Sequence, residues 1–194
     1  MSSTTPADAP STLRNTLLTA LTALVFGFLG AAAWSYSGLA DNRTRTFLLA
    51  NPDLKFGAYQ GHVKLQGIKF VLDGSVQART GYFTRDYKRG SPEGHHPWHG
   101  EPILSEADFI AQAKKVHDRG WQLFVHANGD AAIDMAIRCF DALGIKAADD
   151  RRPIVIHSQF QRPDQLAAYK RIGVGPAYFS NHTWYWADVH RTNF

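Results

Sequence analysis

LFVHANGDAAID, residues 123–134, joins an apolar strand to the start of a helix and decides the fold class of this chain. The strand, Trp121 to Ala127 (WQLFVHA), is an almost continuous apolar run, which is typical of a buried strand in a parallel sheet. A helix is predicted to follow over Ala131–Leu143, with Asp130 as its cap. His126 therefore lies at the carboxyl end of a buried strand.

The same order of strand and then helix recurs on both sides of this stretch, which implies right-handed crossovers and a parallel α/β sheet. One of these helices begins with a capping-box pattern, Ser105 followed by Asp108. A Gly-, Pro- and His-rich excursion, Thr84 to Pro102, interrupts the order and is of a length that is usually functional. The further strands are predicted over Gly67–Leu72, Ile154–Ile156 and Val174–Phe179, and the further helices over Ser105–Arg119 and Pro163–Ile172.

The composition is that of a globular protein. The 194 residues suggest one domain, and 44% hydrophobic with 20% charged residues argues against general disorder. The single cysteine, Cys139, excludes an internal disulfide framework. The net charge of +4 comes from scattered residues and not from a basic stripe, so nucleic acid is not an expected partner.

The amino-terminal forty residues differ in kind. They begin with a Ser-, Thr- and Pro-rich stretch that we expect to be unstructured, and residues 17–34 are mostly apolar. This run is predicted to form an apolar helix that acts as a signal or membrane anchor, or alternatively a buried helix of a larger domain. The expected organisation is residues 1–40 and then one domain over residues 41–194. The chain is exported or membrane-anchored if residues 15–36 act in this way, and cytoplasmic otherwise.

Three side chains on the predicted strands are candidates for chemistry. Lys69 lies inside an apolar strand, where a lysine is costly unless it is neutralised or paired. His126 and His157 each end an apolar strand, so in a parallel sheet they reach the same edge, where α/β barrels keep their active sites. Two neutral imidazoles there are suitable ligands for a first-row metal. The alternative is that each histidine only hydrogen-bonds within the core.

Four segments resemble successive motifs of amidohydrolase family 3, which includes N-substituted formamide deformylases and belongs to the metal-dependent hydrolase superfamily. They are VKLQGIKFVLDGSVQART (63–80), LFVHANGDAAID (123–134), RRPIVIHSQ (151–159) and FSNHTWYWADVHR (179–191). The resemblance implies that residues 41–194 form an incomplete barrel, a partial TIM-type (β/α)8 barrel comprising the middle to later strands, with one or two divalent metals, often zinc. It implies a small-molecule substrate whose amide or formamide C–N bond is attacked by a metal-activated water.

The resemblance also implies roles for individual residues. Lys69 matches a metal-bridging lysine that carbon dioxide carbamylates, and His126 and His157 match metal ligands. Substrate-binding or supporting roles are implied for four residues at family-typical positions: Asp73, Arg79, His182 and Asp188.

The departures from the family pattern bear on activity. Ile156 stands where Glu is usual and Ala187 where Gly is usual, and the chain has no His-x-His pair. We expect the chain to end before the strand that carries the catalytic Asp, so the catalytic residue is unknown and the chain is a fragment with little activity alone. His95, His96 and His99 lie in the excursion and favour a solvated or substrate-facing loop over a metal site.

Three interpretations follow. The first is a stretch of a metal-dependent hydrolase that acts on non-peptide C–N bonds. The second is a remnant that binds a metal or ligand without catalysis. The third is a membrane-anchored, partner-binding domain whose half-barrel is completed by oligomerisation.

Overall fold

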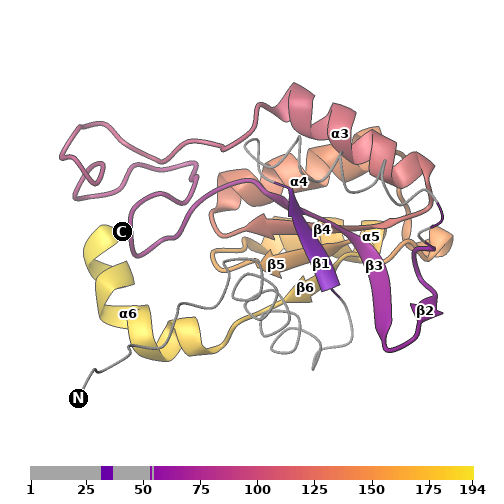
Figure 1. Ribbon diagram of the computed structural model, residues 1–194. Helices are drawn as coiled ribbons and strands as arrows, with labels where there is room; N and C mark the ends of the chain where they lie inside the picture. The colour runs from indigo at the N-terminus through magenta and orange to yellow at the C-terminus, as the bar shows by residue number, and fades with distance from the viewer. Residues whose placement is uncertain (1–31, 37–52, 54) are drawn as a thin grey trace, which may run out of the picture.

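Five parallel strands form the central sheet of the computed structural model, which describes residues 32–36, 53 and 55–194 (Figure 1). A short strand, β2 (Tyr59–Gln60), pairs antiparallel with the start of β3. Every neighbouring pair in the main sheet is parallel, as predicted. The order across the sheet is β1 (Ala32–Tyr36), β3 (Val63–Val71), β4 (Gln122–Ala127), β5 (Ile154–His157) and β6 (Gly175–Ala177).

Three helices connect successive strands and pack side by side on one face of the sheet (Figure 1). They are α3 (Glu106–Asp118), α4 (Asp130–Ala142) and α5 (Pro163–Ile172), and a 3-10 turn, η1 (Ala147–Asp149), follows α4. The capping prediction for α3 is confirmed, because the Ser105 side chain accepts a hydrogen bond from Asp108 N at 3.1 Å. Asp130 is not the cap of α4: Gly129 holds that position, and the Asp130 carboxylate is occupied elsewhere.

Strand alternation separates two faces of the sheet. Every second residue of the central strands packs beneath the helices, as Phe70 of β3 and Val125 of β4 do. The intervening positions, which include Lys69 and His126, face the opposite side. The residues buried under the helices from these strands are Ile68, Phe70, Leu72, Leu123, Val125, Ala127 and Val155.

The carboxyl-terminal part departs from the predicted elements. β6 covers only Gly175–Ala177 of the predicted Val174–Phe179; it lies at the end of the strand order, where a residue without an N–H such as Pro176 is tolerated. The helix α6 (Asn181–Asn193) was not predicted. Its three consecutive aromatic residues, 184–186, give no helical periodicity, and all three are exposed.

The long excursion between β3 and α3 contains no helix or strand, as predicted for Thr84–Pro102. A small apolar cluster of Val76, Phe83 and Tyr87 packs it against Phe160 and Phe194, which brings it beside α6 (Figure 1). The three histidines of the excursion, His95, His96 and His99, are exposed.

The predicted apolar helix, residues 17–34, lies outside the described residues except for its last three positions, which belong to β1. The backbone of β1 pairs in parallel with β3. Within the described residues, no helix has the length and apolar character needed to span a membrane.

Candidate functional site

The three predicted metal ligands come from three neighbouring strands. Lys69 of β3 is in register with Phe124 of β4, two residues before His126, so both side chains lie on the face away from the helices. His157 ends β5, and its ring centroid lies 4.8 Å from that of His126, with the two rings nearly perpendicular. The structure thus brings the two histidines together, as the strand-end argument predicted.

The orientation of His157 depends on an unusual backbone turn. Ala127, a helix-side residue, is in register with His157, so regular alternation would direct the His157 side chain under the helices. Instead, His157 and Ser158 adopt left-handed backbone conformations, with φ of 71° and 46°. Non-glycine residues rarely adopt this conformation, and it is enriched at functional sites. The turn explains how the His157 ring comes to meet His126.

The electrostatic surroundings keep both imidazoles neutral. Burial lowers the pKa of His157 to about 4, with further contributions from His126, His182 and Lys69. Burial likewise lowers the pKa of His126, and the Lys69 charge lowers it further. Neutral imidazole is the form that binds a metal. The candidate ligands are therefore in the required protonation state.

Unpartnered atoms show whether these residues fit a metal. The buried Nδ1 of His157 has no hydrogen-bond partner in the described part of the chain. His126 Nε2 lies 3.0 Å from Asn128 Nδ2 and 3.4 Å from Gly74 O, whereas no partner within the described residues approaches its Nδ1. The Nζ of Lys69 has no hydrogen-bond or ion-pair partner among the described residues, and burial lowers its pKa. The two imidazoles therefore fit a metal site in their protonation and free donor atoms, whereas Lys69 does not fit one in its unmodified form.

The remaining donor set is small. No group of three or more His, Cys, Asp or Glu side chains among the described residues is placed to hold a metal. Lys69 is the third ligand that the family resemblance implies, and as a lysine it must be modified before it can bind a metal as an anion.

Asp73 is completely buried and ties two loops together. Its Oδ1 accepts a hydrogen bond from Asn128 N at 2.9 Å, and its Oδ2 accepts from Gly129 N and Tyr82 N at 2.8 and 3.0 Å. Burial raises the pKa of Asp73 to about 7, against the effect of these three N–H donors. Its Oδ1 lies 3.5 Å from His126 Nε2. This position supports the loop that carries His126 and leaves no carboxylate surface for a substrate.

The other predicted substrate-binding residues have different surroundings. Arg79 donates to Gly90 O and Ser91 O, both at 3.0 Å, and so shapes the excursion. Asp188 is exposed on α6 and forms no hydrogen bond or ion pair with described residues. His182 lies beside His157, with ring centroids 5.2 Å apart. Of the four, only His182 contacts the histidine pair and also lines a pocket.

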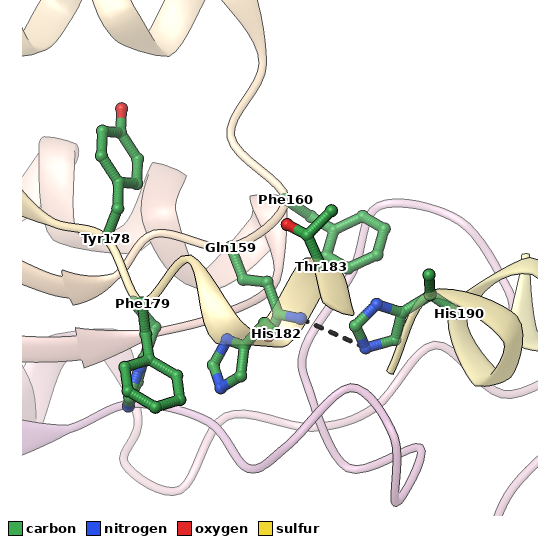
Figure 2. A pocket seen from close by; sticks show the side chains of 9 residues that line it. Gln159, Phe160, Tyr178, Phe179, His182, Thr183 and His190 are labelled. Atoms are coloured by element: carbon green, nitrogen blue, oxygen red, sulfur yellow. Dashed lines mark hydrogen bonds between the residues drawn. The ribbon is translucent and has the colours of Figure 1, made fainter. Parts of the chain in front are cut away.

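The pocket lies between the end of β5 and α6 and encloses about 270 Å³ (Figure 2). Of its nine lining residues, only His157 and His182 were predicted as site residues. Among the others, Gln159 and His190 contact each other, with the Gln159 amide nitrogen 3.1 Å from His190 Nε2. Positions 183, 187 and 190 share one face of α6, but the sequence did not predict this helix, so it gave no signal for His190. The lining contains no Asp, Glu, Lys or Arg: His157, Gln159, Phe160, Tyr178, Phe179, His182, Thr183, Ala187 and His190.

Two solved structures have a similar fold. They are an uncharacterized metal-dependent hydrolase from Pyrococcus horikoshii OT3 (24% identity, TM-score 0.59) and one from Pyrococcus furiosus (24% identity, TM-score 0.60). The aligned regions cover 73% and 75% of this chain but 28% and 29% of those chains. This chain therefore spans less than a third of their length, and the shared fold confirms the predicted fold class, a partial TIM-type barrel.

The search of curated proteins gave no match. The model of the amidohydrolase family matches residues 27–192, which is most of the chain and includes all four motifs. This match in sequence agrees with the strand-end histidines and with the partial barrel fold. The chain belongs to the amidohydrolase family.

Proposed function

We propose that this chain contributes part of the active site of a metal-dependent hydrolase that acts on non-peptide C–N bonds of the amide or formamide type. The observation that carries the proposal is the pairing of His126 with His157, whose rings lie 4.8 Å apart at the carboxyl edge of the sheet. The buried Nδ1 of His157, which has no hydrogen-bond partner among the described residues, supports the proposal because it is available to bind a metal. We propose zinc as the metal, since neutral imidazoles suit it.

Lys69 is the proposed third ligand. Burial lowers the pKa of Lys69 and so raises the fraction of neutral amine, whose nitrogen can attack the carbon of CO2; as the new N–C bond forms, the nitrogen releases one proton to solvent, and the product is an anionic carbamate. Such a carbamate removes a buried cation from an apolar strand and supplies oxygen ligands. A divalent metal held by these residues would lower the pKa of a water molecule and polarise a substrate carbonyl.

The pocket beside His157 is the proposed location of the substrate's organic group. His157 is the member of the histidine pair that lines it, and the other lining residues carry no acidic or basic side chain of Asp, Glu, Lys or Arg; three of them, Phe160, Tyr178 and Phe179, are aromatic (Figure 2). His182, which contacts both His157 and Phe179, is the proposed substrate-binding residue of this wall. For Arg79 and Asp73 we propose that they support the loops around the site. Asp188 does not line this pocket, so we propose that it would bind only a part of the substrate that extends outside the pocket.

A second candidate function is metal binding without turnover. Asp73 is the carboxylate nearest to His126, and its oxygens are already occupied by three backbone N–H groups. The lining of the pocket beside His157 contains no carboxylate that could accept the proton that hydrolysis releases. We therefore propose that the chain alone turns over slowly or not at all.

An assay of turnover and an assay of zinc binding together separate hydrolysis from metal binding without turnover. Release of amine from a panel of formamides and acetamides, in the presence of Zn²⁺, is expected to be weak for the wild type and absent for His126→Ala/His157→Ala. His117→Ala, on α3, is the control for loss of a histidine. Turnover that survives in the double variant would refute the proposed ligands, and zinc binding without turnover would support the second function.

The carbamate is tested separately with ¹³C-labelled bicarbonate. A carbamate resonance is expected in the wild type and in Lys64→Met, which changes an exposed end of the same strand. It should be absent in Lys69→Met. A spectrum that Lys69→Met leaves unchanged would contradict carbamylation at this residue.

Membrane contact through residues 17–34 and completion of the barrel by oligomerisation stay predictions. Alkaline carbonate extraction tests the first, and light scattering coupled to size-exclusion chromatography tests the second.

A further inference from the structure

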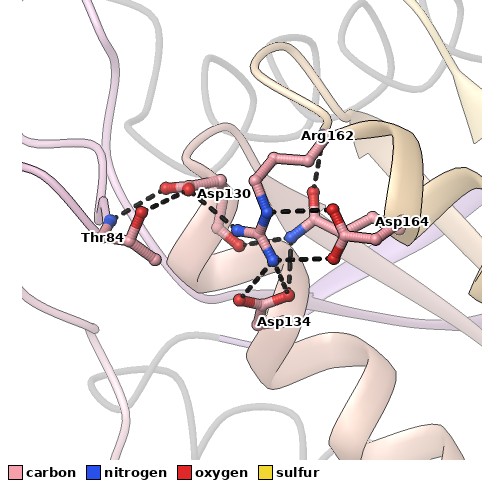
Figure 3. Close-up of polar contacts among 6 residues, drawn as sticks. Thr84, Asp130, Asp134, Arg162 and Asp164 are labelled. Atoms are coloured by element: carbon pink, nitrogen blue, oxygen red, sulfur yellow. Dashed lines mark hydrogen bonds and ion pairs between the residues drawn. The ribbon is translucent and has the colours of Figure 1, made fainter.

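Arg162 joins the segments that follow the two histidine-bearing strands, β4 and β5 (Figure 3). It lies five residues after His157, at the position preceding α5. Its Nη1 donates to Asp130 at 2.8 Å, and its Nη2 donates to both oxygens of Asp134 at 2.9 and 3.0 Å. Both aspartates lie in the first turns of α4, immediately after the loop that follows His126. One guanidinium thus connects the β5–α5 turn to the β4–α4 turn.

The neighbours of Arg162 extend this connection. Gln165 is buried, and its amide donates to Asp130 O and to Asp134 Oδ1 at 2.8 and 2.7 Å, while its oxygen accepts from Arg162 N. Asp130 also accepts from the backbone and hydroxyl groups of Thr84, at 2.9 and 2.5 Å, which attaches the long excursion (Figure 3). Burial acts to raise the pKa of Asp130, but the hydrogen bonds from Thr84 and Arg162 hold it below its usual value.

The turn that Arg162 closes contains the left-handed residues His157 and Ser158. For side chains with a Cβ this conformation is unfavourable, and it persists only where the surroundings hold it. The beginning of the turn is fixed by two backbone hydrogen bonds, from Ser158 N to Ala127 O and from Phe160 N to Asn128 O, both 3.0 Å. The end of the turn is fixed by Arg162. Both ends of the turn are therefore held by the same segment, which runs from the end of β4 into the start of α4.

We propose that Arg162 is a positioning residue, which keeps the His157–Ser158 turn left-handed and thereby directs the His157 ring toward His126. Because the guanidinium binds two carboxylates of α4 with a fixed planar geometry, it sets the distance between the two histidine-bearing loops. The consequence for metal binding rests on the proposed function. The predicted effect on the orientation of the His157 ring does not rest on the proposed function, because this effect concerns the metal-free protein.

The chain offers a matched control. Arg171 also joins α5 to α4, through a bidentate pair with Asp141, with contacts of 2.5 and 2.9 Å. This pair lies at the opposite ends of the same two helices, far along the chain from both histidine loops. Arg171→Met therefore removes an equivalent interhelical ion pair without touching the turn.

The first measurement is the NOE between the ring protons of His126 and His157 in the metal-free protein. It is expected in the wild type and in Arg171→Met and lost in Arg162→Met. The second is Co²⁺ affinity, followed by the visible absorption of the ion. Arg162→Met is expected to weaken it about 10- to 100-fold, the usual effect of removing a residue that orients a metal ligand. Arg171→Met should remain within about twofold of the wild type.

Two milder variants keep the test valid if Arg162→Met does not fold. Arg162→Lys keeps one charge without the planar fork, so the NOE and Co²⁺ affinity should fall between those of the wild type and Arg162→Met. Asp134→Asn, which weakens one partner only, should show a partial loss of both.

Each outcome is decisive. Arg162 variants that retain both the NOE and the affinity would overturn the inference, as would an equal loss in Arg171→Met. If the wild type binds no Co²⁺ through its histidines but the NOE depends on Arg162 alone, the proposed function fails and the positioning role stands.

Discussion

Replacing Asp73 with alanine tests the connection between the β3 and β4 loops. The substitution removes the acceptors of three backbone N–H groups, those of Tyr82, Asn128 and Gly129, all within 3.0 Å of the carboxylate. Asp73 is completely buried, so water is not at hand to replace it. A hydrogen bond to a charged group contributes about 1.5–3 kcal/mol, and each buried donor left unpaired costs about 1–3 kcal/mol.

The losses from the three hydrogen bonds are not fully additive, and partial relaxation of the surrounding chain lowers the total loss of stability. We therefore expect Asp73→Ala to reduce the free energy of unfolding by about 3–5 kcal/mol, which is near the upper end for single substitutions. Asp73→Asn keeps the shape and one acceptor oxygen but places an amide nitrogen against at least one N–H donor. Its expected loss is smaller, about 1.5–3 kcal/mol.

Urea unfolding followed by circular dichroism measures these losses, provided that the m-value is unchanged. Asp118→Ala is the control, since it removes an exposed carboxylate that pairs with Lys114 at 2.8 Å. That change is expected to cost less than about 0.5 kcal/mol. If Asp73→Ala unfolds within about 1 kcal/mol of Asp118→Ala, the carboxylate does not hold the loops together and the reasoning fails.

Two further predictions concern the buried thiol of Cys139 and the close packing at Gly129. Burial raises the pKa of the Cys139 thiol to about 12, so Ellman's reagent should leave the folded chain unlabelled at mildly alkaline pH and label one thiol after unfolding; rapid labelling of the folded chain would contradict the burial. Gly129→Ala should destabilise by at least about 2 kcal/mol, because the added Cβ would lie 1.9 Å from Tyr82 O. Gly175→Ala, whose Cβ would meet only Ile154 at 3.9 Å, should be near neutral, and equal stability of the two variants would contradict the close approach.

Much of the fold could be predicted from local sequence patterns. The helix over Pro163–Ile172 has its predicted bounds, and α3 differs from its prediction by one residue at each end, because apolar spacing, caps and glycine stops are local signals. The edge strand β6 and the helix α6 were less predictable. Each has an incomplete apolar face among the described residues, so periodicity gives little signal there.

The site could be predicted only in part. Strand ends place His126 and His157 at one edge, but alternation alone would have turned His157 beneath the helices. The left-handed turn that prevents this depends on hydrogen bonds to residues some thirty positions away, such as the one from Ser158 N to Ala127 O. Arg162 and its partners were missed for the same reason, since tertiary ion pairs leave no local pattern.

Titration calorimetry with Zn²⁺ tests the central claim most directly. The account predicts about one zinc bound per wild-type chain, a similar stoichiometry for His117→Ala, and loss of binding in His126→Ala/His157→Ala. A wild-type chain that binds no zinc, or a double variant that binds it as the wild type does, would contradict the claim that these two histidines form a metal site.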